Sequence, residues 1–364
     1  MVLRSGCFGV KLVVPALVAA LISASAEAAT VEEIANLKGP DRETVLIEGA
    51  KREGKVMLYS AMIEDQALRP IIKAFKEKYP FIDAEFWRAD TRDLINKALA
   101  EARARSVNVD IVEGGGVSQG MIRAGVTQAF SLPILTSYEK DLYDPKGMWA
   151  ATRLSYFGLA YNTKLVTAGD APKTYDDLLD PKWKGRLAWA ATTETGGAAM
   201  FITFIRSWMG DEKGEAWLAK LSQQKIANLS GSPREVVNKV MDGEYAMSLG
   251  IFLNHPIISA QKGAPVAPRP LEPVVGNASV MILMKAAPHP HAAMLLMDFL
   301  LSRKGQEVIR DADYLPADPG VETPKALDPI IPSKANLQRK FLSEEDIFAA
   351  RTKSLEIQKK YFQN

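Results

Sequence analysis

Apolar residues in the first third of the chain follow two alternating periods. Residues 55–60 and 109–112 are short apolar runs of the kind found in buried strands, and residues 81–88 alternate as a strand does. Between these runs, apolar residues recur at three- and four-residue spacing, which predicts amphipathic helices. The two helical stripes are Leu68, Ile71, Ile72, Phe75 and Tyr79, and Leu94, Ile95, Ala98, Leu99 and Ala102. Strands separated by such helices indicate βαβ units and a parallel sheet covered on both faces.

A second α/β unit begins near the middle of the chain. Residues 149–161 are rich in β-forming side chains, and residues 187–191 and 245–251 also have strand patterns. Helices are expected near residues 197–208 and 212–221. A further helix is expected after Ser232, because Ser232, Pro233 and Glu235 together form a capping box with Pro at the first helical position.

The last part of the chain returns to strand and helix patterns. Residues 274–284 are expected to form a strand, residues 292–307 a strongly apolar helix, and residues 314–364 a Pro-rich and then charged helical stretch. We therefore expect an α/β fold of two lobes with mixed, mainly parallel sheets, joined by two hinge crossings near residues 149–155 and 272–276. The expected boundaries are 29–150 plus 275–315 for lobe 1, 151–274 for lobe 2 and 316–364 for a C-terminal helical segment packing on the lobes.

The N-terminus has the pattern of a cleavable export signal. Two basic residues, Arg4 and Lys11, flank a short apolar run that is followed by small residues in an Ala-x-Ala arrangement. The run is shorter than the roughly 20 apolar residues that span a bilayer. We expect residues 1–28 to be a signal peptide cleaved after Ala28, with Ala26 as the alternative site, and an uncleaved anchor helix as the alternative interpretation.

Composition and charge exclude several classes of function. The 364 residues are 47% hydrophobic and 24% charged, with a net charge of +2 and no basic blocks, so nothing indicates a nucleic-acid partner. The only cysteine, Cys7, lies in the expected signal peptide. The mature protein is thus expected to have no disulfide, no thiolate metal site and no cysteine nucleophile. It is also expected to be a monomer.

Several segments, in this order and spacing, carry a resemblance to a known family. They are residues 48–60, 75–80, 161–164, 181–185, 243–246, 287–293 and 299–302. With these segments the chain resembles the extracellular solute-binding proteins of ABC importers, in the type II periplasmic-binding-protein superfamily. Within that superfamily it is similar to the branch that includes ferric-ion-binding and phosphonate-binding proteins.

The resemblance implies a periplasmic protein whose two lobes close over a small-molecule ligand. It also implies the permease subunits of an ABC importer as partners, no catalytic activity and no cofactor. Ligands of such proteins usually bind at loops that follow strands, where helix N-termini present free N–H groups.

In lobe 1, the ligand is expected at three loops that follow strands. The candidates are Ser60 and Ala61 after the first strand, Arg88 after the second, and Gly115 and Gly116 after the third. Glycines let the backbone approach a ligand closely, and an arginine clamps a carboxylate or phosphonate with two parallel hydrogen bonds. The alternatives are a turn serine and a solvated loop arginine.

In lobe 2, hydroxyls and glycines lie between a strand and a helix. Thr193, Thr195 and Gly196 at this junction suit an anion, with an ordinary helix cap as the alternative. Ser232, His255 and Tyr156 complete the candidate ligand-binding set. Their alternatives are a capping residue, a loop histidine and a core aromatic.

One departure from the ferric-binding relatives bears on the ligand. Those relatives carry an adjacent Tyr pair shortly after the strand equivalent to residues 245–251, whereas this chain has Ile251-Phe-Leu-Asn-His255. Hard Fe(III) needs anionic oxygen ligands. We therefore expect no metal and a small organic anion such as a carboxylate, phosphonate or phosphate ester. A ferric-ion-binding transport protein remains the alternative, because such sites can be rebuilt from other loops.

Two motifs suggest chemistry that the rest of the chain does not support. Residues 116–120 match the G-x-S-x-G nucleophile elbow and would make a secreted serine esterase of Ser118. However, two glycines separate the strand from the motif, and no His-Gly-Gly oxyanion segment precedes it, so we expect Ser118 to be an exposed first-turn residue. The pair His289-x-His291 lacks a third histidine nearby, and no nucleotide-binding GxxxxGK[ST] loop is present.

Overall fold

The computed structural model describes residues 1–2, 29–191 and 196–363. Residues 3–28 of the expected signal peptide therefore lie outside the described residues. The helices are α1 (Val31–Ala35), α2 (Arg42–Glu53), α3 (Arg69–Lys78), α4 (Thr91–Ala104), α5 (Ser118–Arg123), α6 (Gly197–Met209), α7 (Asp211–Leu221), α8 (Pro233–Met241), α9 (Asn254–Gln261), α10 (Pro290–Leu301), α11 (Arg303–Asp311), α12 (Pro332–Ala335) and α13 (Glu344–Phe362). The strands are β1 (Lys55–Ser60), β2 (Asp83–Arg88), β3 (Ile111–Gly114), β4 (Thr127–Gln128), β5 (Ala150–Asn162), β6 (Leu187–Ala190), β7 (Ala227–Leu229), β8 (Met247–Phe252), β9 (Val266–Arg269), β10 (Val274–Met284), β11 (Leu315–Pro316) and β12 (Arg339–Phe341).

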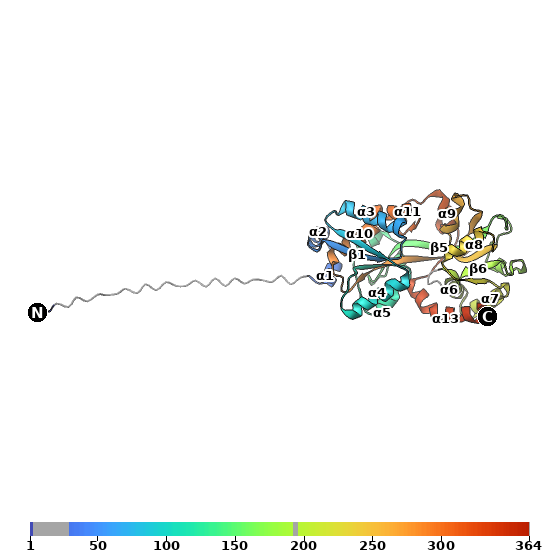
Figure 1. Cartoon of the computed structure of the whole chain (residues 1–364), viewed down its shortest axis with the longest axis horizontal. Coiled ribbons are helices and arrows are strands. Elements are labelled where there is room, and N and C mark those ends of the chain that lie inside the picture. The colour runs from blue at the N-terminus through green and yellow to red at the C-terminus, as the bar shows by residue number, and fades with distance from the viewer. Residues whose placement is uncertain (3–28, 192–195, 364) are drawn as a thin grey trace.

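The strands form one sheet that runs through the whole molecule, in the order β2-β1-β3-β10-β5-β8-β6-β7 (Figure 1). The pairs at both ends are parallel: β1 with β2 and β3, and β6 with β7 and β8. The two long central strands, β5 and β10, are antiparallel to each other and to their neighbours β8 and β3. Because β5 and β10 are shared by both ends of the sheet, they form the two connections between the halves of the molecule.

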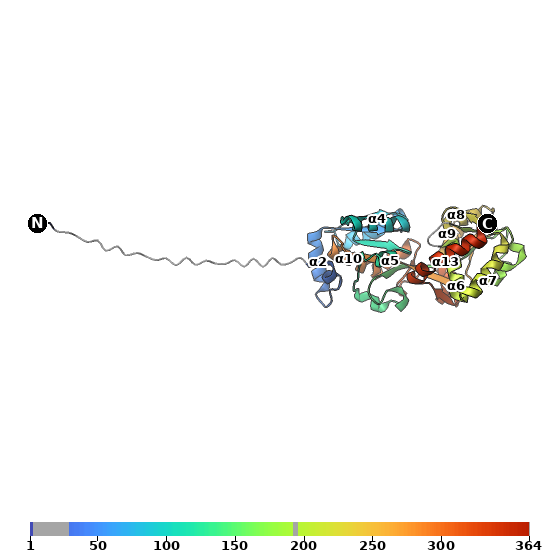
Figure 2. The same ribbon diagram turned by 90° about the horizontal axis from the view of Figure 1, so that it is seen from below.

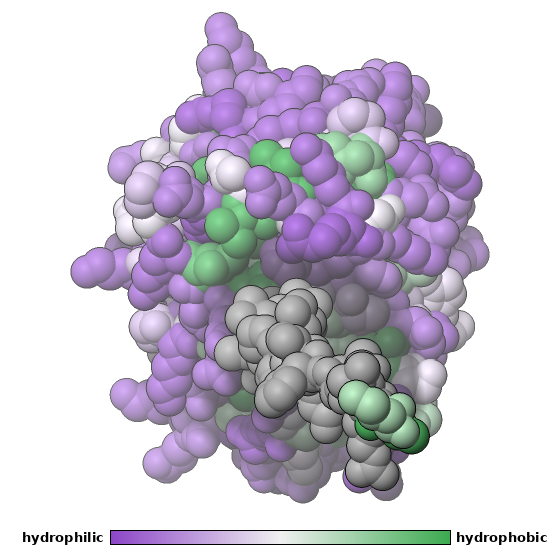
Figure 3. Space-filling model, turned by 90° about the vertical axis from the view of Figure 1, so that its left-hand side faces the viewer, coloured by the Kyte–Doolittle hydropathy of each residue, from purple (hydrophilic) through white to green (hydrophobic). Residues whose placement is uncertain are grey.

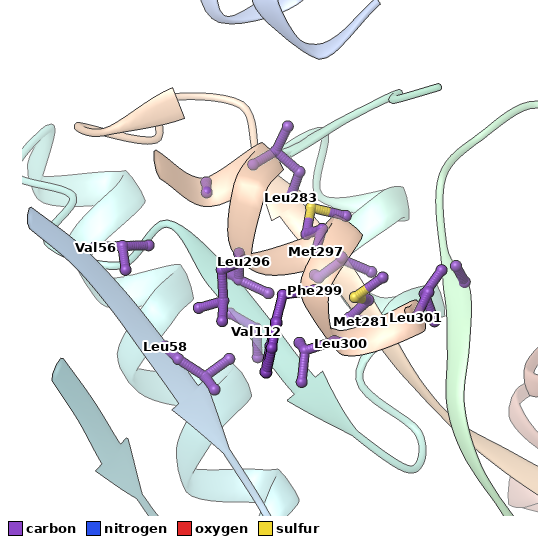
Figure 4. Packing of buried hydrophobic residues seen from close by; sticks show 14 of the residues in the cluster. Val56, Leu58, Val112, Met281, Leu283, Leu296, Met297, Phe299, Leu300 and Leu301 are labelled. Carbon is purple, nitrogen blue, oxygen red and sulfur yellow. The ribbon is translucent and has the colours of Figure 1, made fainter. Parts of the chain in front are cut away.

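The core of the first half lies between α10 and the sheet. The side chains that meet there come from β1, β3, β10 and α10 (Figure 4). They include Val56, Leu58, Val112, Met281, Leu283, Leu296, Phe299 and Leu300. Each fully buried side chain of this size contributes roughly 1.5–3 kcal/mol to folding relative to an exposed one. We call this half, with α1–α5, α10, α11 and β1–β4, lobe 1.

The other half has a separate, aromatic core. Its largest fully buried side chains are Trp189 on β6, Phe204 on α6 and Phe157 on β5, and Trp217 of α7 packs in the same cluster. The ring of Tyr175 lies 5.2 Å from that of Phe204, and its hydroxyl donates to the carbonyl of Pro273 (3.1 Å). We call this half, with α6–α9 and β6–β9, lobe 2. The boundaries expected from the sequence stay a prediction, although the largest cluster of buried residues in each lobe draws on similar stretches of the chain.

The C-terminal segment contacts both lobes. Strand β12 pairs in parallel with residues 274–276 of β10. After it, α13 starts where the two halves meet and runs along α6 to the end of the chain (Figure 2). Its Ser354, Ile357 and Gln358 are buried. The segment thus lies across the junction between the lobes.

Most predicted elements are present, but the apolar helix expected over residues 292–307 is two helices. Its break lies at Ser302, which has an extended backbone, accepts from the N–H of Gly305 (3.2 Å) and donates to the carbonyl of Phe299 (2.6 Å). Ser302 therefore caps α11 at the point where α10 ends, so that the chain turns between two packed helices.

The face of the molecule shown in Figure 3 is mostly hydrophilic where it is coloured, with a smaller apolar area beside the polar residues. Within the part of the chain that the structure describes, no helix is both long and apolar enough to cross a membrane.

Candidate functional site

Strand β3 of lobe 1 and strand β6 of lobe 2 end toward the space between the lobes. A cavity of about 520 Å³ lies there, lined by α4, the loop between β3 and α5, α6 and α13. Its polar lining is Thr91, Arg92, Asn96, Gln119, Thr203, Glu344 and Arg351, and its apolar lining includes Ile95, Met200, Ile347, Phe348 and Leu355. The volume falls in the range of roughly 300–1,000 Å³ that is usual for small-molecule sites.

The loop after β3 forms one wall of this cavity. Gly116 has a φ of 83°, a left-handed conformation that favours glycine. The hydroxyl of Thr91 donates to the carbonyl of Gly115 (3.1 Å), which ties the start of α4 to the loop. Of the glycines expected to approach a ligand, Gly116 lines the cavity.

The free N–H groups of this loop meet a carboxylate of the chain itself. Glu344, the first residue of α13, accepts from the backbone N–H of Gly116 (2.5 Å) and from the backbone N–H (3.3 Å) and hydroxyl (3.1 Å) of Ser118. The side chain is buried, and burial raises the pKa of Glu344 to about 7, although these three donors favour the ionised form. The loop's donors therefore already have an acceptor in this conformation.

Ser60 and Ala61, expected to contact a ligand, face the interior of lobe 1. The hydroxyl of Ser60 is buried and donates to Oε2 of Glu113 (2.6 Å), and the N–H of Ala61 donates to the carbonyl of Glu113 (3.1 Å). Glu113 also accepts from the hydroxyl of Thr152 (2.8 Å) and from the guanidinium of Arg153. Ser60 is thus one member of a buried polar cluster that joins β1, β3 and β5.

Arg88 lies at the end of β2 as expected, and its partly exposed guanidinium pairs with Asp90 (3.3 Å). Arg88 is not in the lining of the cavity, whereas Arg92, four residues later in α4, is, together with Arg351 of α13. The sequence pattern thus indicated the loop, and the helix that follows it supplies one of the two cations.

In lobe 2, Gly196 comes directly before α6, with a φ of 80°. A Cβ at this position would lie 3.0 Å from Cγ of Pro233 and 3.1 Å from the carbonyl oxygen of Gly250, so only glycine fits easily. Thr193 and Thr195 lie outside the described residues, and their expected role stays a prediction. Ala191 and the first turns of α6 line the cavity.

Ser232 and His255 lie near each other on lobe 2. Ser232 caps α8 with the full capping box that its sequence predicts. Arg234 of α8 donates to the carbonyl of His255 (3.1 Å). The imidazole packs 5.1 Å from the ring of Phe252, and its buried Nδ1 has no hydrogen-bond partner among the described residues. Burial, with a smaller contribution from Arg234, lowers the pKa of His255 to about 4, so the ring is neutral at pH 7.

Tyr156 lines a different cavity. This second cavity, of about 370 Å³, is formed by β5 and the C-terminal segment and also contains Arg339. Burial raises the pKa of the Tyr156 hydroxyl. Arg339 is held by Glu139 (2.8 Å) and Asp141 (3.2 Å). The structure therefore does not bring Tyr156 together with Gly116 and the other residues of the first cavity.

Sequence reasoning missed the residues that α13 contributes, namely Glu344, Phe348 and Arg351. A helical stretch was expected there, but its pattern carries no signal that its first turns face the junction between the lobes. Met200 and Thr203 on α6 were likewise not singled out, because an apolar helix face is indistinguishable from core by its pattern alone.

The esterase interpretation fails at Ser118. This residue begins α5, but it is buried rather than exposed, and its hydroxyl donates to Glu344 instead of a histidine. The expectation of an exposed first-turn residue is thus wrong, because α13 covers it. Of the histidines, His289 bonds Asp110 (3.0 Å), His291 bonds Glu53 (2.6 Å), and His255 belongs to lobe 2.

The described part of the chain holds no group of three or more His, Cys, Asp and Glu side chains placed to bind a metal ion. The two His–carboxylate pairs, His289 with Asp110 and His291 with Glu53, join the start of α10 to the segments before β3 and β1. They are therefore contacts that hold α10 in place.

Known proteins share this fold. Iron-bound HitA from Pseudomonas aeruginosa superposes with a TM-score of 0.71 at 22% identity, covering 84% of this chain and 99% of that one. The binding protein AfuA from Actinobacillus pleuropneumoniae, with fructose-6-phosphate bound, gives a TM-score of 0.70 at 20% identity over 85% of this chain and 99% of that one. The predicted mixed α/β fold is thereby confirmed.

Sequence comparison gives the family. An uncharacterized protein of Haemophilus influenzae is 24% identical over 270 residues, which are 71% of this chain and 76% of that protein. A family model for bacterial extracellular solute-binding proteins matches residues 108–343. This family consists of binding proteins, so the prediction that the chain is not an enzyme is confirmed. The chain belongs to the bacterial extracellular solute-binding proteins.

Proposed function

We propose that the protein captures a small organic anion between its two lobes, in the periplasm, and delivers it to the permease subunits of an ABC importer. The observation that carries the proposal is the cavity lined by both lobes, with the guanidinium groups of Arg92 and Arg351 on its wall. Arginine is the side chain best suited to carboxylates and phosphate esters, because its planar donors match their oxygen pairs.

The processing, the oligomeric state and the lobe boundaries that we propose are those expected from the sequence. Residues 1–28 would be removed on export, and the mature chain would act as a monomer. Its units would be lobe 1 (29–150 plus 275–315), lobe 2 (151–274) and a C-terminal segment (316–364). The ligand would favour the closed state by the contacts that it makes with both lobes at once.

Two similar structures support different cargo. HitA is iron-bound, and AfuA has fructose-6-phosphate bound. A phosphate ester agrees with the cations at the cavity. Iron remains the second candidate because HitA is iron-bound, and the described residues provide no cluster of three or more His, Cys, Asp and Glu side chains that could hold a metal ion.

A thermal-shift screen tests the proposal. The compounds to be screened are simple carboxylates, phosphonates, sugar phosphates, ferric citrate, free citrate and neutral sugars. A ligand that binds only the folded protein raises its apparent stability, by about 2.7 kcal/mol at one hundred times its Kd. We expect an organic anion to give the largest shift. Binding of neutral sugars, or of iron without an anion, would overturn the proposal.

Two variants locate the site. Arg92→Gln removes a cation from the cavity wall and is expected to weaken binding of the best anion about tenfold or more, since charge-assisted hydrogen bonds contribute roughly 1.5–3 kcal/mol. Arg103→Gln, on the exposed end of the same helix, is the matched control and should bind like the wild type. Equal affinities for both variants would place the ligand elsewhere.

A further inference from the structure

Helix α13 is a third connection between the lobes. Its C-terminal half is fixed to lobe 2, where Ser354 shares a hydrogen bond with Thr203 of α6 (2.8 Å), and Gln358 donates to the carbonyl of Ala191 (2.9 Å). Lys360 pairs with Glu215 of α7 (2.9 Å). These contacts extend over the last turns of the helix.

The first turns of the same helix are fixed to lobe 1. Glu344 accepts the three hydrogen bonds from Gly116 and Ser118, and the Arg123 guanidinium of α5 lies 4.5 Å from the ring centre of Phe348. A single helix of 19 residues therefore spans the junction beside the cavity. If the lobes move apart on this side, one of its two attachments has to release.

We propose that Glu344 is a proton-sensitive latch, which fastens α13 to lobe 1 and so controls the opening of the cavity between the lobes. The attachment to lobe 1 is the one to release, because it consists of one carboxyl and one ring contact, whereas the attachment to lobe 2 includes a buried face packed on α6. The consequence for ligand release rests on the proposed capture function, but the latch itself does not.

Burial sets the direction of the pH effect. In the latched state the pKa of Glu344 is raised to about 7, and a carboxyl released into water returns to its ordinary value of 4.5. Protonation therefore favours the latched state, which is favoured most below pH 4.5 and loses this advantage as the pH rises through 7. The ratio of latched to released protein should fall about tenfold between pH 6 and pH 8.

The donors to Glu344 are uncharged groups, so the neutral acid can keep most of this contact. Its oxygens still accept from Gly116, and its own proton can be donated to the hydroxyl of Ser118. The charged side chains on the described elements around it include Arg92 and Asp93 on α4, Arg123 on α5, Arg206 on α6, and Glu345, Asp346 and Arg351 on α13.

The latch is tested by measuring the distance between the lobes without any ligand. In the full chain with Cys7→Ser, spin labels at Arg103→Cys on lobe 1 and Lys220→Cys on lobe 2 occupy exposed helix positions. Double electron–electron resonance should show one main distance at pH 6 and a second, longer-distance population at pH 8. A distance distribution that does not change with pH overturns the proposal.

Two variants assign the effect to Glu344. Glu344→Gln keeps the shape and cannot ionise, so the labelled protein should show the pH 6 distribution at both pH values. Glu345→Gln, at the exposed neighbouring position, should respond to pH like the wild type. A pH response retained by Glu344→Gln, or lost in Glu345→Gln, would contradict the latch. Because no ligand is present, either outcome leaves the anion screen to be decided separately.

Discussion

At the scale of single residues, the buried cluster around Glu113 is the most demanding feature of lobe 1. Glu113 and Arg153 are both buried, and Ser60 and Thr152 complete the hydrogen bonds of the carboxylate. Glu113→Gln would leave the buried guanidinium without its counter-charge. We expect a loss of about 3 kcal/mol or more in the free energy of unfolding, measured by urea denaturation.

The matched control for Glu113 is Glu77→Gln. Glu77 pairs with Lys73 at 3.9 Å on the surface of α3, with 64% of its side chain exposed. Surface pairs of this kind contribute about 1 kcal/mol or less. If both variants lost the same stability, the interior cluster would have no special role in holding β1, β3 and β5 together.

His255 predicts a sensitivity to acid. Its pKa is about 4 in the folded protein because burial disfavours the charged ring, while an unfolded histidine takes up its proton near its ordinary value of 6.5. The folded state therefore loses stability as the pH falls from 6.5 to 4, by up to about 3 kcal/mol. His255→Asn should lose less stability than the wild type between pH 7 and pH 4.5, measured by urea denaturation.

His289 supplies the contrast, because its pairing with Asp110 raises the pKa of the imidazole. This pair stabilises the fold at low pH and loses that contribution as the pH rises. His289→Gln should therefore become more acid-sensitive than the wild type, the reverse of the change at His255. Parallel pH profiles for the two variants would mean that neither histidine is held in the environment that the structure shows.

Single residues also show which side-chain roles can be predicted from the sequence and which cannot. The capping box at Ser232 was predictable, because its partners are three residues away. The role of Ser60 was not, since its partner, Glu113, lies 53 residues further along the chain and a serine at a strand end has the same appearance whether it faces a ligand or a buried carboxylate. Sequence patterns therefore predict hydrogen bonds between residues that are close in the chain, and not those between distant residues.

At the scale of elements, the sequence predicts which helices and strands exist better than it predicts the residues at which they begin and end. Strands β1, β2, β3, β5, β6, β8 and β10 and helices α3, α4, α6 and α7 were expected from the sequence, whereas α2, α9, β7 and β9 were not. The break between α10 and α11 was not predicted: the apolar run ends at Leu301 and residues 302–307 are polar, but a polar stretch can also continue a helix on its solvent face, and the turn depends on how the two helices pack. The position of α13 depends equally on tertiary contacts, which explains why its cavity residues were missed.

The junction of β8 and α6 gives a prediction at this scale. Gly250 has a φ of 66°, and a Cβ there would lie 2.6 Å from the carbonyl oxygen of Gly197. Gly263 also has a positive φ, 86°, but a Cβ there meets nothing within 4 Å. Both Ala variants suffer the left-handed penalty of roughly 1–2 kcal/mol, and only Gly250→Ala adds a clash between backbones.

We therefore expect Gly250→Ala to lower the free energy of unfolding by clearly more than Gly263→Ala, in thermal or urea denaturation. The difference between the two variants isolates the close approach of the strand to the helix start. Equal losses would indicate that α6 can shift away from β8 without cost, and that Gly250 is not required for the geometry of this loop.

At the scale of the whole molecule, the shared strands determine how the halves can move. The lobes have separate cores, and the chain passes between them through β5, β10 and the C-terminal segment. A continuous sheet can bend or twist at its centre while each core stays packed, since interiors are dense and do not deform gradually. Rotation of two rigid lobes is thus the motion that this architecture favours.

Small-angle scattering can measure this motion. The anion with the largest thermal shift should reduce the radius of gyration, because a ligand that contacts both lobes favours the closed state in proportion to its differential affinity. The reduction should be greater at pH 8 than at pH 6, since an engaged Glu344 latch leaves less opening for the ligand to close. A ligand that stabilises the protein without any compaction would show that it binds one lobe only, and capture by closure would then be wrong for this protein.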